Sequence, residues 1–199
     1  MTRIGVLATQ GNVAENVAAS RAALGPSGSA VRVASAREVD SVDALVIPGG
    51  ESTAIGPLSE LSGAMGAIRR RAESDSMPIL GICAGLVLMA SSARDRPTGA
   101  AASPLGLLDV DVERNSYGRQ RLSFEADVAM PGLGIGTVRG AFIRAPTVAR
   151  AGDGVEVLAR LGERIVAVRQ GAMVGVSFHA ELGGHALHGA FARMAQGRR

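Results

Sequence analysis

The single cysteine of the chain, Cys83, lies between paired glycines at the point where an apolar strand is predicted to become a helix. Gly81-Ile82-Cys83-Ala84-Gly85 is the cysteine analogue of the G-x-S-x-G nucleophile elbow, a sharp turn that exposes a nucleophile above a sheet. A helix N-terminus favours a thiolate, and the backbone amide of Ala84 could stabilise an oxyanion. The alternative is an inert core thiol, since free cysteines are often buried.

A histidine and a carboxylate lie two residues apart in Ser177-Phe178-His179-Ala180-Glu181. In an extended segment, residues with this spacing point to the same side, so Glu181 could orient the imidazole of His179. An oriented imidazole that meets a thiol is the base of a catalytic triad. By itself this spacing is common, and the alternative is a His–Glu pair on an exposed strand end.

Paired glycines also follow the apolar run Val46-Ile47, in Pro48-Gly49-Gly50-Glu51-Ser52-Thr53. Backbone amides at the carboxyl edge of an open α/β sheet suit an oxyanion or a carboxylate ligand. Taken alone, the segment is a turn followed by a helix cap. Combined with Cys83 and His179, it favours acyl transfer by a cysteine nucleophile with a histidine base.

Alternating strands and helices must position these residues. Short apolar runs predict buried strands at Ile4–Ala8, Val31–Val33, Ala44–Ile47 and Ile79–Ile82. Helices are predicted from Asn12 to Leu24, from the glycine pair to about Ala72, and over Ala84–Ala93, with Asn12 and Glu15 forming a capping box at the start of the first. This order indicates a parallel sheet with helices on both faces.

The second half of the chain reads mainly as strands joined by short turns. They are predicted at Leu107–Glu113, Leu122–Asp127, Gly136–Ile143, Val155–Leu161, Arg164–Arg169 and Met173–Phe178, before a last helix over His185–Gln196. No repeat or long linker interrupts the pattern. The expected fold is therefore one α/β domain spanning residues 1–199, with three layers and a mixed, mostly parallel central sheet flanked by helices. The Arg69–Arg71 triplet is expected to be solvated, and His185 and His188 to face solvent or to pack.

The composition excludes several kinds of chemistry. The chain has 199 residues, of which 47% are hydrophobic and 20% charged, as in globular proteins. All 21 basic residues are arginine, so Schiff-base catalysis and a lysine-bearing P-loop are impossible. One cysteine cannot form an internal disulfide or a multi-cysteine metal site. We expect neither a metal nor a cofactor.

Charge and hydropathy argue against nucleic-acid and membrane partners. The net charge is only +3, the arginines are scattered, and aromatic residues make up 3% of the chain. No uncharged apolar stretch approaches the roughly 20 residues that a membrane span needs. The apolar run after Met1-Thr2-Arg3 is too short for a signal peptide. A cytoplasmic location is the expectation.

Several motifs, in one order along the chain, resemble class I (triad) glutamine amidotransferases, and within them the glutaminase subunit of pyridoxal 5'-phosphate synthase. The motifs are Ile4-Gly5-Val6-Leu7 with Gln10-Gly11, Gly49-Gly50-Glu51-Ser52-Thr53, Gly81-Ile82-Cys83-Ala84-Gly85, Val112–Gln120, Phe142-Ile143-Arg144-Ala145-Pro146 and Phe178-His179-Ala180-Glu181-Leu182. The similarity extends from residue 3 to about residue 182.

The resemblance implies a flavodoxin-like class I glutamine amidotransferase fold. It also implies hydrolysis of L-glutamine to glutamate and ammonia, with the ammonia passed to a separate synthase subunit that makes pyridoxal 5'-phosphate. Carried onto this chain, Cys83 is the nucleophile, His179 the general base and acid, and Glu181 the residue that orients His179.

The resemblance further implies a glutamine-binding set, made up of Gly50, Glu51, Ser52, Arg114, Ile143 and Arg144. A guanidinium can hold an α-carboxylate with two hydrogen bonds, and Glu51 could meet the α-ammonium group. The sequence does not assign the carboxylate to one arginine. Backbone amides near Gly50 and Ala84 would form the oxyanion hole.

The chain departs from the family pattern at three positions. Ala180 replaces the usual proline between base and orienter, Thr9 stands before Gln10 where leucine is more usual, and Asn16 replaces a common histidine of the first helix. Two alternatives remain: a glutaminase subunit of another amidotransferase pathway, and a non-catalytic regulatory module of the same fold.

Overall fold

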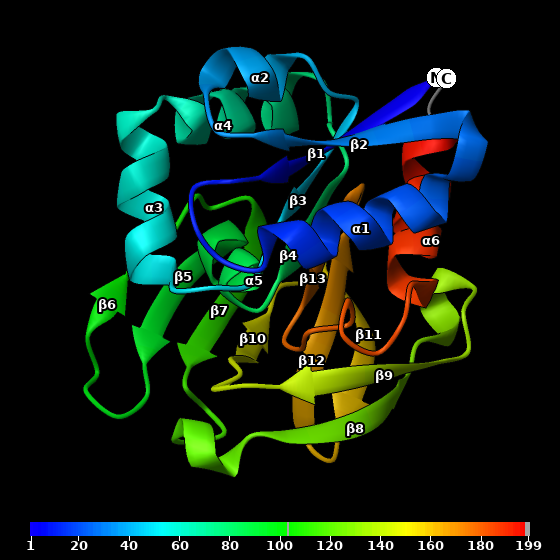
Figure 1. The fold of residues 1–199 in the computed structure, drawn as a ribbon. Coiled ribbons are helices and arrows are strands. Elements are labelled where there is room, and N and C mark those ends of the chain that lie inside the picture. The colour runs from blue at the N-terminus through cyan, green and yellow to red at the C-terminus, as the bar shows by residue number, and fades with distance from the viewer. Residues whose placement is uncertain (103, 198–199) are drawn as a thin grey trace.

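Short, fully apolar strands lie side by side at the centre of the molecule, as Figure 1 shows for the computed structural model, which describes residues 1–102 and 104–197. Residues 103, 198 and 199 of the expected domain lie outside the described residues. Across the described residues, one eleven-stranded sheet has the order β2-β1-β3-β4-β13-β12-β10-β7-β5-β6, with β11 paired to β12. From β2 to β13 the strands are parallel. Beyond β13 the sheet is mixed.

The elements alternate first and then become mostly strands. The helices are α1 (Val13–Leu24), α2 (Ala36–Asp40), α3 (Ser52–Leu61), α4 (Ala64–Ser74), α5 (Ala84–Met89) and α6 (Ala186–Gln196). The strands are β1 (Thr2–Leu7), β2 (Gly28–Val33), β3 (Ala44–Ile47), β4 (Ile79–Ile82), β5 (Ala90–Asp95), β6 (Ala101–Ala102), β7 (Leu108–Arg114), β8 (Phe124–Ala129), β9 (Thr137–Phe142), β10 (Thr147–Ala151), β11 (Glu156–Leu161), β12 (Arg164–Gln170) and β13 (Met173–Val176).

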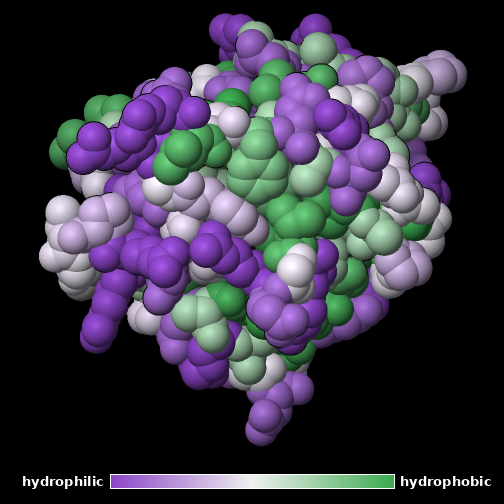
Figure 2. Space-filling view, turned by 90° about the horizontal axis from the view of Figure 1, so that it is seen from below, coloured by the Kyte–Doolittle hydropathy of each residue, from purple (hydrophilic) through white to green (hydrophobic). Residues whose placement is uncertain are grey.

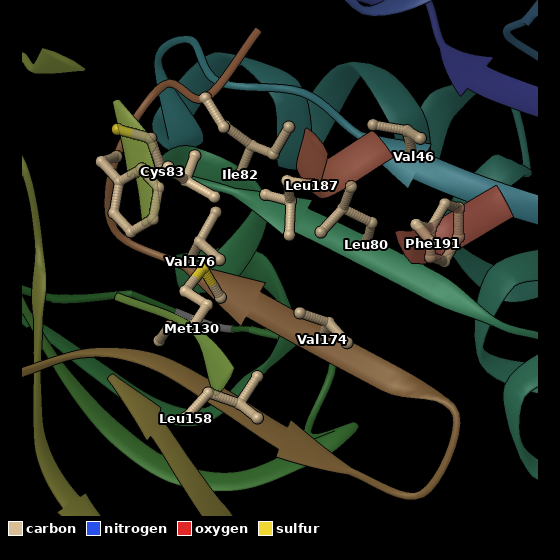
Figure 3. Packing of buried hydrophobic residues seen from close by; sticks show 14 of the residues in the cluster. Val46, Leu80, Ile82, Cys83, Met130, Leu158, Val174, Val176, Leu187 and Phe191 are labelled. Atoms are coloured by element: carbon tan, nitrogen blue, oxygen red, sulfur yellow. The ribbon is translucent and has the colours of Figure 1, made fainter. Parts of the chain in front are cut away.

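Each central strand is buried on both faces, and alternate residues enter two different cores. Val46 and Leu80 pack in the core beneath α1 and α6, whereas Leu45 and Ile79 pack in the core beneath α3, α4 and α5. Figure 3 shows Leu187 of α6 beside Leu80 of β4 in the first of these cores. The predicted fold is confirmed: a central sheet is covered by helices on both faces.

A second, two-stranded sheet, β8 paired with β9, packs against the core on the α1 and α6 side. Its Phe142 is fully buried and lies in an aromatic cluster with Tyr117, Phe124 and Phe178. An isolated bridge joins Ala141 of β9 to His179. The small sheet thus supports the segment that carries His179.

The predicted helix over Ala84–Ala93 is wrong in its second half. The helix ends at Met89, and Ala90–Asp95 form β5, which pairs in parallel with β7. Alanine and serine have no strong preference for strand, so the pairing with a distant segment decides the conformation. Strand β10 and helix α2 were not predicted either.

The prediction that the Arg69–Arg71 triplet is solvated is wrong for Arg71. The side chain of Arg71 is 18% exposed, and its guanidinium donates hydrogen bonds to the carbonyls of Val39, Asp40 and Val42 at the end of α2. Arg71 therefore satisfies the free carbonyls of a neighbouring helix end, which is a role that spacing along its own helix does not indicate.

None of the described helices combines the length and the apolar character that crossing a membrane would need.

Seen from the side of β8 and β9, apolar residues gather near the centre of a largely hydrophilic surface (Figure 2).

Candidate active site

Cys83 occupies a strained turn between β4 and α5. Its backbone has φ 50° and ψ −100°, in a region that non-glycine residues rarely adopt. The turn requires its glycines, because a Cβ on Gly85 would lie 2.1 Å from the carbonyl oxygen of Ile47, and one on Gly81 would lie 2.8 Å from the carbonyl carbon of Gly85. The backbone amide of Cys83 donates to the carbonyl of Val176, which ties the turn to β13. The predicted elbow geometry is present.

His179 and Glu181 form a buried pair beside this elbow. The distance from Nδ1 of His179 to Oε1 of Glu181 is 2.8 Å, and the carboxylate side chain of Glu181 is 0% exposed. The other face of the pair is closed by Gly49, where a Cβ would lie 2.2 Å from Cε1 of the imidazole. The two side chains therefore share a side, and the glycine at residue 49 lets the loop pack directly against the ring.

The imidazole of His179 lies between Glu181 and Cys83. Burial lowers its pKa, but hydrogen bonds with Cys83 and with Glu181 outweigh burial and raise the pKa from the ordinary 6.5 to about 10. The imidazolium form is therefore favoured at neutral pH.

A cavity of about 240 Å³ opens above Cys83. It is lined by Asn12, Gly50, Glu51, Ser52, Cys83, Ala84, Val87, Arg114, Asn115, Gln120, Ile143, Arg144, Pro146 and His179. All of the predicted binding residues are in this lining. Glu181 is absent from it because it lies behind His179. The volume is below the roughly 300–1,000 Å³ of drug-sized sites, so the cavity suits a smaller molecule.

The carboxylate of Glu51 meets two arginines at the rim of this cavity. Arg114 lies 3.1 Å from its Oε1, and Arg144 lies 3.6 Å from its Oε2. The Arg114 side chain is only 13% exposed, whereas that of Arg144 is 45% exposed. The cavity therefore holds one carboxylate and two guanidiniums, a set complementary to the two charged groups of an α-amino acid.

The loop that carries Glu51 is fixed from the end of β1. The side-chain oxygen of Gln10 accepts a hydrogen bond from the Glu51 amide at 2.9 Å, and the Asn12 amide donates to the carbonyl of Gly49 at 3.0 Å. A Cβ on Gly11 would lie 2.0 Å from that same carbonyl. Gly11 therefore lets two loops from different strand ends touch.

Two cavity residues besides Cys83 have a positive φ. These are Asn115 (54°) and Arg144 (47°), and the Nε of Arg144 donates to the side-chain oxygen of Asn115 at 3.1 Å. The amide nitrogen of Asn115 is hydrogen-bonded to Asp95 of β5. Strained residues persist where neighbours fix them, so these contacts hold the arginine at the cavity.

Comparison with known proteins assigns the chain to one family of enzymes. Residues 6–196 match the sequence model of the SNO glutamine amidotransferase family. The chain belongs to this family. One relative is the pyridoxal 5'-phosphate synthase subunit PdxT of Nitrosopumilus maritimus, 51% identical over 184 residues that cover 90% of this chain and 89% of that protein. Another is PdxT of Mycobacterium avium, 46% identical over 98% of this chain and 97% of that protein.

Solved structures agree with this assignment. A crystal structure of a glutamine amidotransferase superposes with a TM-score of 0.86 at 41% identity, covering 97% of this chain and 98% of that one. A glutamine amidotransferase from Thermotoga maritima has a TM-score of 0.63 at 14% identity, covering 90% of this chain and 76% of that one. At that identity the second likeness shows the fold alone.

In this glutamine amidotransferase, sequence reasoning missed one polar residue near the predicted base. Asn12 was predicted to cap α1, but its side chain makes no cap hydrogen bond, and its amide nitrogen lies 3.4 Å from Oε1 of Glu181. The available signal was its place just after β1, because ligand sites of open α/β sheets lie at the carboxyl ends of strands. Four further residues of the cavity lining were also not predicted as site residues: Val87, Asn115, Gln120 and Pro146.

Proposed function

We propose that this chain is the glutaminase subunit of a pyridoxal 5'-phosphate synthase, with Cys83, His179 and Glu181 as its catalytic triad. The observation that carries the triad is geometric. A strained elbow places Cys83 in the lining of a cavity that His179 also lines, and Nδ1 of this imidazole lies 2.8 Å from a buried carboxylate. The proposed glutaminase domain is the whole chain, residues 1–199.

The first half of the reaction forms a thioester. His179 holds the proton of the Cys83 thiol, and the thiolate attacks the carboxamide carbon of L-glutamine. Backbone amides at Gly50 and Ala84 would hold the oxygen of the tetrahedral intermediate, and such a donor contributes about 10²–10³ in rate. The carbon–nitrogen bond then breaks, and His179 gives its proton to the departing nitrogen, which leaves as ammonia.

The second half releases glutamate. A water molecule attacks the thioester carbon while His179 accepts a proton from it. The carbon–sulfur bond breaks, and the sulfur of Cys83 takes the proton back. Glu181 keeps one face of the imidazole oriented through both halves, as the carboxylate does in other triads.

Charge complementarity supports glutamine as the substrate. A guanidinium at the cavity can bind the α-carboxylate, and Glu51 can bind the α-ammonium group. Arg114 is the stronger candidate for the carboxylate, because its side chain is more buried than that of Arg144 and charged contacts strengthen away from solvent. Gly50, Ser52 and Ile143 complete the proposed binding surface.

The ammonia produced here would be consumed by a partner. The relatives PdxT are named as subunits of pyridoxal 5'-phosphate synthase, so we place the same synthase subunit beside this chain. The absence of lysine agrees with this division, because a chain without lysine cannot form the imines of lysine-dependent carbon chemistry.

The first prediction concerns the nucleophile. Mixing the purified chain with its synthase partner should release glutamate from L-glutamine, and Cys83→Ala should lower kcat by several orders of magnitude because no thioester can form. Glutamate release is measured in a coupled assay, alongside pyridoxal 5'-phosphate formation. Equal release by both proteins would contradict the mechanism. Glutamine hydrolysis without pyridoxal 5'-phosphate would instead point to another synthase.

A further inference from the structure

A fully buried histidine outside the proposed triad, His188 of α6, contacts a buried asparagine of α1. The exposed fractions are 1% for His188 and 0% for Asn16, and Nε2 of His188 lies 2.9 Å from the side-chain oxygen of Asn16. Helices α1 and α6 pack side by side on one face of the sheet (Figure 1). Burying two polar side chains is costly unless they are hydrogen-bonded to each other or to a third group.

The hydrogen bonds leave only one proton arrangement for this pair. The side-chain nitrogen of Asn16 donates to the carbonyl of Asn12 at 2.8 Å, so its oxygen faces His188 and must accept from Nε2. A neutral imidazole with its proton on Nε2 has a bare Nδ1, and Nδ1 has no partner among the described residues. Burial also lowers the pKa of His188 to about 4, against a smaller opposing effect of Glu181, with His185 lowering it slightly further.

The chain of contacts continues to the proposed triad. The backbone carbonyl of Asn12 accepts the hydrogen bond from the side chain of Asn16. The side-chain nitrogen of Asn12 in turn donates to Oε1 of Glu181 at 3.4 Å. The same oxygen accepts from Nδ1 of His179 at 2.8 Å, while Oε2 has no partner among the described residues. Only one of the two carboxylate oxygens is therefore held, and Asn12 is the neighbour besides His179 that holds it.

We propose that Asn16 and His188 are positioning residues, which fix Asn12 so that its amide holds the carboxylate of Glu181 on the imidazole of His179. The donor on His188 and the Asn12 carbonyl together select the orientation of the Asn16 amide. A rotated amide would face its nitrogen toward the Nε2–H donor and its oxygen toward the Asn12 carbonyl, so that like groups would oppose each other at both ends. Without the selection, the Asn12 carbonyl keeps only the longer hydrogen bond from the Asn16 backbone amide, at 3.3 Å, so the position of Asn12 is less tightly fixed. This inference rests on the proposed role of Glu181.

The test compares variants of the full chain in complex with the synthase partner. Asn16→Leu and His188→Phe each replace the polar side chain by an apolar one of similar size. His188→Gln instead keeps a hydrogen-bond donor that can reach Asn16. Ser20→Ala is the matched control, because Ser20 is a buried polar residue of α1 whose hydroxyl has no partner among the described residues.

We expect Asn16→Leu and His188→Phe to lower kcat by about 10-fold or more with little change in KM, since misplaced catalytic groups slow the chemical step. His188→Gln should restore most of the rate, and Ser20→Ala should match the unmodified chain. Iodoacetamide gives a second measurement, because Cys83 is the only cysteine and its alkylation reports on His179. Alkylation at pH 7 should slow in the two impaired variants only.

Three outcomes would overturn the inference. The first is unchanged kcat and alkylation in both Asn16→Leu and His188→Phe while Glu181→Gln loses activity, which rejects the positioning role alone. The second is an equal loss in His188→Gln and His188→Phe, which attributes the effect to packing. Full activity of Glu181→Gln would reject the proposed triad and, with it, this inference.

Discussion

At the scale of single residues, the site is an arrangement of charges that neutralise one another. The imidazole of His179 is held between a thiol and a carboxylate, and Glu51 is held between two guanidiniums. Each charged group therefore has an opposite charge nearby before any substrate arrives, which reduces the cost of keeping charges in a partly buried cavity. A substrate with an ammonium and a carboxylate can replace a contact between Glu51 and an arginine. Its ammonium then pairs with Glu51 and its carboxylate pairs with the arginine, so that no charge is left unpaired.

The raised pKa of His179 predicts a pH-dependent contribution to stability. Because the folded pKa, about 10, exceeds the ordinary 6.5, the folded state binds this proton more tightly than the unfolded state does. The stabilisation is complete below pH 6.5 and is lost as the pH rises through about 10. The difference in free energy of unfolding between the unmodified chain and His179→Asn should therefore shrink over this interval, as measured by urea denaturation.

The control for this measurement is His185→Asn, because His185 is an exposed histidine at the start of α6. This variant reports the effect of the same histidine-to-asparagine change at an exposed position. A difference for His179→Asn that stays constant from pH 6.5 to pH 10 would show that the imidazole is not held as an imidazolium.

At the scale of elements, the elbow depends on how closely α5 approaches the sheet. Gly85 is the point of closest contact, because no side chain would fit between its Cα and the carbonyl of Ile47 at the end of β3. The short helix then buries every one of its residues. The position of the nucleophile is therefore set by helix-to-strand packing as well as by the turn itself.

Gly85→Ala should destabilise the protein, whereas Gly66→Ala should stabilise it. The added methyl at residue 85 meets backbone at 2.1 Å and should cost at least about 1–3 kcal/mol through overpacking. At residue 66, an exposed position of α4, nothing lies within 4 Å of the added methyl. Loss of unfolded-state entropy should then raise the free energy of unfolding by about 0.4–1 kcal/mol. Urea denaturation measures both, and a stable Gly85→Ala protein with normal activity would contradict the account of the elbow.

At the scale of the whole molecule, the small sheet is joined to the site through aromatic rings. Phe142 stacks on Phe124 with ring centroids 4.8 Å apart, and lies 5.3 Å from Phe178, the residue before the proposed base. Gly140 makes room for this contact, because a Cβ there would lie 2.4 Å from the Phe178 ring. The β8–β9 sheet thus packs against the segment that carries His179, which directly follows β13.

Phe142→Ala should lower the free energy of unfolding by about 3–5 kcal/mol, because a fully buried ring leaves a cavity that the cluster cannot refill. Phe124→Ala removes a ring that is only partly buried and should cost less. Thermal or urea denaturation measures both changes. An equal cost for the two rings would contradict the central place assigned to Phe142.

The sequence by itself determined the features that depend on neighbouring residues. Glycines spaced around Cys83 indicate an elbow because the turn is local, and the two-residue spacing of His179 and Glu181 puts them on one side because strand geometry is local. Apolar runs likewise predicted the buried strands at the centre of the sheet. The resemblance of several motifs then indicated the family, and the family comparison confirmed it.

Only the tertiary structure decided the features that depend on contacts between distant segments. Ala90–Asp95 form a strand because they pair with β7. The side chain of Asn12 does not cap its helix but contacts Glu181, 169 residues away. His188 entered a buried pair with Asn16 across 172 residues. Local propensities at these positions differ by only about 1 kcal/mol or less, so a hydrogen bond or a strand pairing supplied by packing outweighs them.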